Sequence, residues 1–270
     1  MLARRLHYPF IATISGRFGS HVMKYSKKTN ATLAAQALPI SPPSLLQTMR
    51  ELRVVWEATR AATGWLSRRR HRGQARPVMV IPGFLATDTH TWPLRRHLSG
   101  CGFKVYPWEL GINRGPRGDT LRKLALRVRA ISQLHGEPVQ LVGWSLGGLL
   151  ARLTANRTQT KVSRVITLGS PLSGDPNCSR LGPLLRAVGG GLNPRKMRRL
   201  LLESQQMPVI SIFSRSDGVV AWRASANCAG DDTSIEVDSS HIGMVVNPDV
   251  LDVLARQLNQ PANAFASASI

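Results

Sequence analysis

The chain has 270 residues, enough for one large domain or two small ones, and its hydrophobic content of 43% is ordinary for a globular protein. No apolar run approaches the length of a bilayer span, so we expect no membrane-spanning helix. Three cysteines without paired spacing argue against a disulfide framework and against a structural zinc site. The charge is unusual, since 36 Lys and Arg against 15 Asp and Glu give a net charge of +21.

The positive charge is concentrated near the start of the chain. Residues 1–76 hold 14 Lys and Arg and two acids, Glu51 and Glu57, for a net charge of +12, and residues 77–270 carry the other +9. Such an excess favours contact with anionic phospholipid or nucleic acid, although a solvated basic surface has the same composition. No recognised nucleic-acid-binding motif accompanies the charge, so we expect no specific nucleic-acid binding.

Residues 1–43 have the composition of a disordered tail, because they are basic and contain no acid. The apolar stretch after Arg5 is interrupted by His7, Tyr8 and Pro9, which does not favour a secretory signal peptide. An organelle transit segment has a similar composition and remains an alternative. We expect a cytoplasmic protein, with peripheral attachment to a membrane as the open question.

Residues 44–76 read as an amphipathic helix that begins after Ser44, ends near Gly64 and is followed by an Arg-rich linker. The most common arrangement is that such a helix packs on its own domain. The alternative is a helix on an anionic membrane surface, because the run Arg-Arg-Arg-His-Arg follows at residues 68–72. The apolar residues at helical spacing are Leu45, Met49, Leu52, Val55, Trp56 and Leu66.

From Pro77 onward, short apolar strands alternate with helices. This order implies right-handed βαβ crossovers and the fold class α/β, a doubly wound and mostly parallel sheet flanked by helices. We expect a catalytic domain over residues 77–260, with a short lid-like insert over residues 171–207, and a flexible tail over residues 261–270. The expected strands are residues 78–81, 104–108, 138–142, 162–168, 209–213 and 234–237, and the main expected helices are residues 91–98, 119–135, 148–156 and 248–258.

The pentapeptide Gly-Trp-Ser-Leu-Gly at residues 143–147 lies between an expected strand and an expected helix. This context is typical of a nucleophile elbow, in which a tight turn exposes the hydroxyl of the central serine, here Ser145. A glycine-rich turn with a solvated serine is the alternative. The choice depends on whether the rest of the chain supplies a base and an acid.

Two candidate partners follow later strands. Asp217 comes after the strand ending at Phe213, and His241 comes after the last strand. Ligands of parallel sheets bind where the strands end, and a serine hydroxyl needs an imidazole base that a carboxylate orients. The order Ser145, Asp217, His241 is the one expected for Ser-acid-His hydrolases. The rival acids are Asp238 and, less favoured, Asp175, Asp231 and Asp232.

Acyl transfer also requires amide donors for the oxyanion. One donor is expected from Leu146, directly after the serine, and the other from Phe84 in the loop Pro-Gly-Phe at residues 82–84. The glycine in that loop lets its backbone approach the reacting carbonyl.

Taken together, five motifs make residues 77–258 resemble the lipase/esterase branch of the α/β-hydrolase superfamily, which includes small bacterial esterase-like hydrolases. By that resemblance Ser145 is the nucleophile, Asp217 the acid and His241 the base. It likewise assigns Phe84 and Leu146 to the oxyanion hole and implies no cofactor and no metal. The chain departs from the family at Pro82, where many lipases have histidine, in the absence of opening strands before residue 77, and in its short insert. The motifs are Pro-Gly-Phe at 82–84, Gly-Trp-Ser-Leu-Gly at 143–147, Gly-Ser-Pro at 169–171, Ser-Asp-Gly-Val-Val at 216–220 and Ser-His-Ile-Gly-Met at 240–244.

The expected function is therefore a serine carboxylic-ester hydrolase that acts on a small-molecule or lipid ester through an acyl-enzyme on Ser145. An acyltransferase with the same three residues is one alternative. A non-catalytic, membrane-peripheral lipid-binding module is another. The basic and apolar insert suits an anionic lipid or a long acyl ester, although an ordinary amphipathic cap on the sheet is the favoured explanation.

Overall fold

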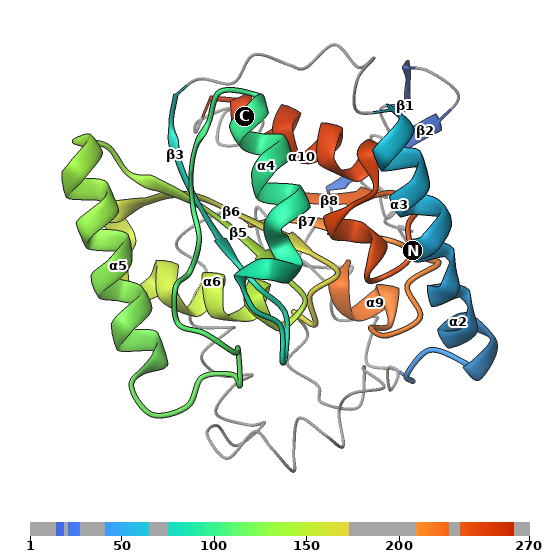
Figure 1. The fold of residues 1–270 in the computed structure, drawn as a ribbon, viewed down its shortest axis with the longest axis horizontal. Helices are drawn as coiled ribbons and strands as arrows, with labels where there is room; N and C mark the ends of the chain where they lie inside the picture. The colour runs from blue at the N-terminus through green and yellow to red at the C-terminus, as the bar shows by residue number, and fades with distance from the viewer. Residues whose placement is uncertain are drawn as a thin grey trace, which may run out of the picture.

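The computed structural model describes residues 15–18, 21–27, 41–64, 75–172, 209–226 and 233–261, and Figure 1 shows their arrangement. Most of the expected insert, part of the Arg-rich linker, the tail after residue 261, and Cys178 and Cys228 lie outside these residues. The described strands form one sheet in the order β1-β2-β8-β7-β6-β5-β3-β4. Its six parallel strands are β3 (Pro77–Ile81), β4 (Lys104–Tyr106), β5 (Val139–Trp144), β6 (Val162–Leu168), β7 (Val209–Phe213) and β8 (Thr233–Glu236).

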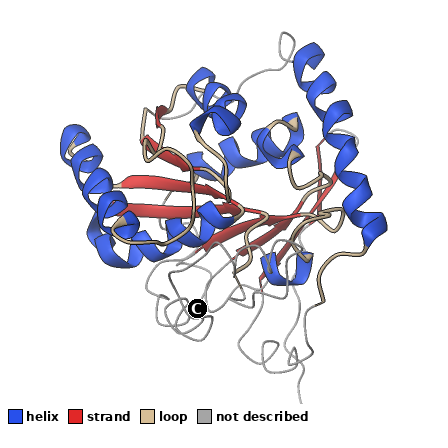
Figure 2. Cartoon of the chain, turned by 60° about the horizontal axis from the view of Figure 1, so that its bottom comes forward, coloured by secondary structure: helices blue, strands red, loops and turns tan. Residues whose placement is uncertain are grey.

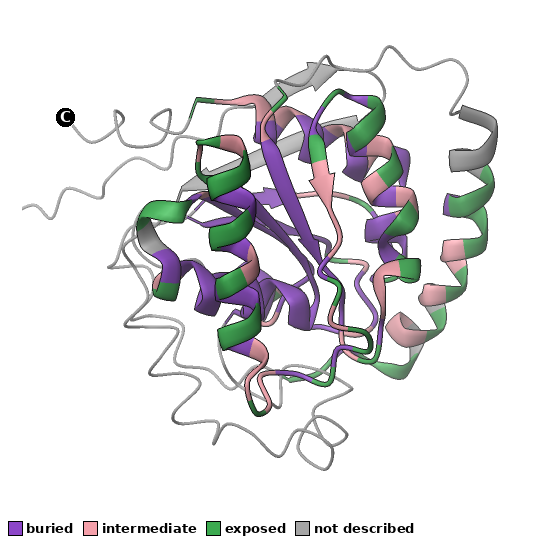
Figure 3. Cartoon of the chain, turned by 60° about the vertical axis from the view of Figure 1, so that its left-hand side comes forward, coloured by how far each residue is buried: buried purple, intermediate pink, exposed green. Residues whose placement is uncertain are grey.

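Helices cover both faces of the sheet, which confirms the expected doubly wound class (Figure 2). Alternate residues of β3 feed two cores, as the period of a strand requires. Val78 and Val80 belong to the core under α4 (Trp92–Gly100) and α10 (Pro248–Asn259). Met79 and Ile81 belong to the core under α5 (Thr120–His135) and α6 (Leu146–Thr158). Strands buried on both faces explain the unbroken apolar runs in the sequence (Figure 3).

A β-hairpin extends the sheet beyond β8. Strand β1 (Ser15–Phe18) pairs with β2 (His21–Lys27), and β2 pairs antiparallel with β8. The expectation of a disordered tail over residues 1–43 is therefore wrong for these two strands. Short polar strands with weak alternation carry little signal in the sequence, and their pairing depends on the exposed edge of β8.

The expected helical segment comprises α2 (Leu45–Met49), the 3₁₀ turn η1 (Arg50–Leu52) and α3 (Arg53–Gly64). Ser44 begins it as expected, since its Oγ accepts from the Gln47 amide at 3.3 Å and its own amide donates to Gln47 Oε1 at 2.8 Å. Helix α3 lies against α10, as Figure 1 shows, and it also contacts the turn η5 (Gly243–Val245).

The apolar side of this segment faces away from the domain. We call its exposed large side chains the apolar stripe: Leu45, Met49, Leu52, Val55 and Trp56. The helix therefore packs on its own domain, as predicted, but through its polar side. Within the described residues, none of the helices combines the length and the hydropathy needed to cross a bilayer.

Candidate active site

Ser145 lies in the turn between β5 and α6 and has a φ of +53°. This value is in the left-handed region, which residues other than glycine rarely adopt. The glycines on either side of it allow this turn. A Cβ on Gly143 would overlap the backbone of the first turn of α6, and a Cβ on Gly147 would overlap the carbonyl oxygen of Ile81. The sequence motif thus forms the strained strand-turn-helix elbow that presents a serine hydroxyl.

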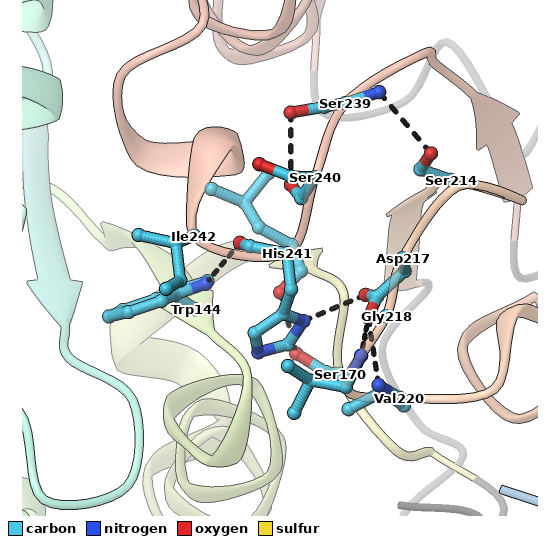
Figure 4. A network of polar contacts seen from close by, with 12 residues as sticks. Trp144, Ser170, Ser214, Asp217, Gly218, Val220, Ser239, Ser240, His241 and Ile242 are labelled. Atoms are coloured by element: carbon cyan, nitrogen blue, oxygen red, sulfur yellow. Dashed lines mark hydrogen bonds and ion pairs between the residues drawn. The ribbon is translucent and has the colours of Figure 1, made fainter. Parts of the chain in front are cut away.

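Asp217 and His241, the predicted acid and base, lie side by side. Figure 4 shows the imidazole Nδ1 beside the carboxylate, with Nδ1 and Asp217 Oδ2 at 2.7 Å. The other carboxylate oxygen, Oδ1, accepts from the amides of Val219 at 2.8 Å and Val220 at 2.7 Å. Both side chains are nearly inaccessible, with Asp217 3% and His241 4% exposed. The carboxylate is thus fixed by its own loop and in turn fixes the orientation and tautomer of the imidazole.

The end of β6 links this pair to the elbow. The amide of Ser145 donates to the carbonyl of Leu168 at 2.8 Å. A Cβ on the next residue, Gly169, would lie 2.9 Å from Asp217 Oδ2 and 3.1 Å from His241 Nδ1. Only a glycine leaves room for the side chains of Asp217 and His241 against this strand end. Nucleophile, acid and base candidates therefore converge on the carboxyl edge of the sheet.

Trp144 supplies a contact that the sequence did not predict. Its indole Nε1 donates to the carbonyl of His241 at 3.1 Å, and the two rings lie 5.8 Å apart (Figure 4). The residue before Ser145 thus holds the backbone of His241. The motif itself, which leaves this position free, gave no signal for that role.

The rival acid Asp238 occupies a different environment. Its carboxylate is exposed and receives both terminal nitrogens of Arg53, at 3.1 and 3.0 Å, together with the hydroxyl of Ser216 at 3.1 Å. The imidazole of His241 pairs with Asp217 instead. Asp175, Asp231 and Asp232 lie outside the described residues.

The loop after β3 lies against the elbow. A Cβ on Gly83 would approach the Ser145 Cβ to 3.3 Å, so the backbone of this loop passes beside the serine. The amides of Leu85 and Ala86 donate to Asn113 O at 2.7 Å and to Gly83 O at 3.1 Å. Among the described residues, none accepts a hydrogen bond from the amide of Phe84, which suits the predicted oxyanion donor.

Asn113 holds that loop in place. Its side chain is fully buried, and its Nδ2 donates to the carbonyl of Pro82 at 2.7 Å while its Oδ1 accepts from Gly115 at 2.9 Å. Its backbone amide also donates to Ala86 O at 2.9 Å. The second predicted donor, the amide of Leu146, lies in the first turn of α6, where helical amides have no partner within the helix.

The electrostatics favour a charged His241. Burial acts to lower the pKa of the imidazole, because a buried ring is harder to protonate. The charge of Asp217, its hydrogen bond to the ring and the charge of Glu51 act in the opposite direction, so the pKa of His241 is raised above its usual 6.5. An imidazolium formed beside Asp217 is therefore stabilised, which is what a general base requires.

Glu51 and Glu57 are polar groups at this site whose role the sequence did not reveal. They lie on η1 and α3. Glu51 reaches both the loop that carries Asp217 and the loop that carries His241, and Glu57 reaches the His241 loop. They are the acids of an otherwise acid-free basic segment, which is the one sequence signal that marks them. No group of three or more His, Cys, Asp or Glu among the residues that the structure describes could hold a metal ion.

No protein-family model matches the sequence, and no curated protein does. Solved structures match the fold. The mature form of lipase BlEst2 from Bacillus licheniformis gives a TM-score of 0.55 over 70% of this chain and 95% of its own, at 16% identity. Lipase B from Aspergillus fumigatus gives 0.53 over 73% of this chain and 56% of its own, at 18% identity.

A third match comes from a study of the metagenome-derived lipolytic enzymes LipS and LipT, with a TM-score of 0.51 over 69% of this chain and 93% of the other, at 14% identity. Likeness at these identities establishes fold rather than activity. The sheet order, the elbow after β5 and these neighbours together show that the chain has the α/β-hydrolase fold, with lipases and lipolytic enzymes among its structural neighbours.

Proposed function

We propose that the protein is a serine carboxylic-ester hydrolase that acts through an acyl-enzyme on Ser145. The observation that carries the proposal is the buried Asp217–His241 hydrogen bond, 2.7 Å long, at the same strand end that fixes the strained Ser145 turn. A carboxylate, an imidazole and a serine so arranged have the roles of acid, base and nucleophile in acyl transfer.

In the proposed reaction, Ser145 Oγ attacks the ester carbonyl carbon while His241 Nε2 takes the hydroxyl proton. Asp217 stabilises the imidazolium that forms, and the amides of Phe84 and Leu146 receive the oxyanion. The bond to the alkoxy oxygen then breaks, and the alcohol leaves with the proton from His241. Water, deprotonated by the same imidazole, then attacks the acyl carbonyl. The bond to Ser145 Oγ breaks, the acid is released, and the imidazolium of His241 returns the proton to Ser145.

Hydrolysis of p-nitrophenyl acyl esters tests the proposal. Ser145→Ala removes the nucleophile, and we expect kcat to fall by roughly 10⁵–10⁶-fold. Ser163→Ala, the same change near the amino end of β6, is the matched control and should leave turnover unchanged. Equal turnover by wild type and Ser145→Ala would contradict the proposal.

The alternatives are separated by the products. An acyltransferase would pass the acyl group to a competing alcohol in preference to water, which product analysis in mixed water and alcohol measures. A non-catalytic lipid-binding module would turn over no ester at all. An acyl product that partitions mainly to water is the result expected for the hydrolase.

We further propose that the apolar stripe contacts an anionic lipid surface. Five large apolar side chains are exposed along α2–α3, which is far more than scattered surface residues require. Both acids of the segment point toward the domain, so the outward side carries no carboxylate, and a basic run follows at residues 68–72. An apolar face without negative charge on a chain of net charge +21 is complementary to anionic phospholipid.

Vesicle flotation with phosphatidylcholine alone and with added phosphatidylglycerol tests this contact. We expect binding to the anionic vesicles, weakened by salt, and its loss in Leu52→Ser. Leu134→Ser on α5 is the matched control, because Leu134 is 72% exposed and Leu52 is 74% exposed. Equal vesicle binding by the two variants would contradict the contact. A chain that binds no vesicles but self-associates, and loses that self-association in Leu52→Ser, would contradict it as well.

A further inference from the structure

The carboxylate of Glu51 bridges the two loops that carry the acid and the base. Its Oε1 accepts from the amide of Gly218, directly after Asp217, at 2.8 Å, and from the amide of His241 itself at 2.8 Å. Its Oε2 accepts from the amide of Ile242 at 3.1 Å. One side chain from η1 therefore satisfies three backbone donors on two loops that are more than twenty residues apart in the chain.

Glu57 makes a second attachment one element further on. The side chain is only 2% exposed, and its Oε1 accepts from the amide of Ser240 at 2.9 Å while its Oε2 accepts from the Ser240 hydroxyl at 2.5 Å. Asn247 Nδ2 also points to Glu57 Oε1, at 3.4 Å. A buried carboxylate is costly unless several donors meet it, so this site is built around the glutamate.

The glycines of the two loops fit this docking. A Cβ on Gly243 would overlap Glu57 Oε2, and a Cβ on Gly218 would overlap the backbone carbonyl of Gln47. The hydroxyl of Thr48 also donates to the carbonyl of Gly218 at 2.9 Å. Each of the two loops thus has, one or two residues after its catalytic candidate, a position that only glycine can occupy while the helical segment is docked.

We propose that Glu51 and Glu57 are positioning residues that hold the Asp217 loop and the His241 loop in catalytic register. The helical segment α2–α3 is then needed for the geometry of the active site, and its removal or displacement lowers turnover. The inference rests on the proposed serine hydrolase function. Glu51 and Glu57 do not touch the substrate and act through the backbone of the two loops.

The charged groups that face His241 allow a test that a purely structural role would not pass. They are Asp217, on the loop after β7, and Glu51, on η1, and both raise the pKa of the imidazole against the effect of burial. Glu51→Gln keeps the shape and one acceptor oxygen but removes the charge. The imidazole should then be easier to deprotonate, so the acidic limb of the kcat/KM profile should move to lower pH.

The experiment compares Glu51→Gln, Glu51→Ala and Glu57→Gln in the full chain. Glu137→Gln, which lies before the amino end of β5 at the opposite edge of the sheet, is the matched charge control. We expect Glu51→Ala to lower kcat on the order of 10- to 100-fold with little change in KM, as a displaced base does. Glu57→Gln should lower kcat in the same way, and Glu137→Gln should behave as wild type in rate and in pH profile.

Fluorophosphonate labelling separates the outcomes, with the labelling rate expressed per folded molecule and the folded fraction measured by circular dichroism. Wild type that labels at Ser145 while both Glu51 variants label at the wild-type rate and with the wild-type pH profile would overturn the positioning role alone. Wild type that does not label would overturn the proposed function instead. Should Glu51→Ala fail to fold, the shape-preserving Glu51→Gln and its acidic limb decide the question.

Discussion

At the scale of single residues, the site depends on Ser145 holding a conformation that costs roughly 1–2 kcal/mol for a residue with a side chain. Glycines at residues 143 and 147 leave out the side chains that would overlap the neighbouring backbone, and the Leu168 carbonyl fixes the serine amide. At Gly169, likewise, a side chain would crowd Asp217 and His241. Strain of this kind is maintained only where the surrounding backbone determines it.

Asp217→Asn tests the link between acid and base. The amide cannot stabilise an imidazolium and favours the wrong tautomer, so we expect kcat for a p-nitrophenyl ester to fall by about 10⁴-fold. Asp238→Asn is the control, because that exposed carboxylate pairs with Arg53. A larger loss in Asp238→Asn than in Asp217→Asn would reverse the assignment of the acid.

The pH dependence follows from the direction of the His241 shift. The base works only when neutral, and its pKa is raised, so kcat/KM should rise with pH along a limb centred above 6.5. The charged pair also stabilises the fold, fully at pH below the unfolded value and less as the pH rises through the raised folded pKa. A limb centred below 6.5 in the pH profile of kcat/KM would contradict this electrostatic picture.

At the scale of elements, the strands could be predicted because burial on both faces leaves a continuous apolar run, and β6 and β7 have the expected bounds. The elbow and its partners could be predicted because each follows a strand end. The docking of α2–α3 could not, because hydrophobic periodicity points the apolar stripe inward. The carboxylates of Glu51 and Glu57 accept hydrogen bonds from backbone amides of the domain, so the polar side of the segment faces inward instead. The 3₁₀ turn η1 also interrupts the regular helical periodicity.

Gly243→Ala tests the fit of α3 against the His241 loop. The added methyl would overlap Glu57 Oε2, so we expect a loss of about 1–3 kcal/mol in the free energy of unfolding. Adding Glu57→Asp shortens the opposing side chain and should recover part of that loss. Denaturant unfolding measures both, and a Gly243→Ala variant as stable as wild type would show that the helical segment is not packed there.

At the scale of the whole molecule, one helical segment has two sides with different contacts. Its polar side accepts hydrogen bonds from the loops that carry Asp217 and His241, and its apolar stripe is exposed. The hairpin β1–β2 adds to the far edge of the sheet, beside β8. Residues before the α/β domain therefore contact the loops that carry Asp217 and His241.

Two truncated chains test this organisation. A chain starting at residue 41 keeps α2–α3 and should retain most ester turnover. A chain starting at residue 65 loses Glu51 and Glu57 and leaves the amides of Gly218, His241 and Ile242 without their acceptor, so turnover should fall with the register of the loops. Turnover per folded molecule that is equal in the two chains would contradict the role of the segment.

The most direct test of the central claim is to label the full chain with a fluorophosphonate and map the modified peptide by mass spectrometry. We expect one adduct, on Ser145, that forms slowly in Asp217→Asn and not at all in Ser145→Ala. A folded wild-type chain that acquires no adduct, or acquires it on another residue, would contradict the account.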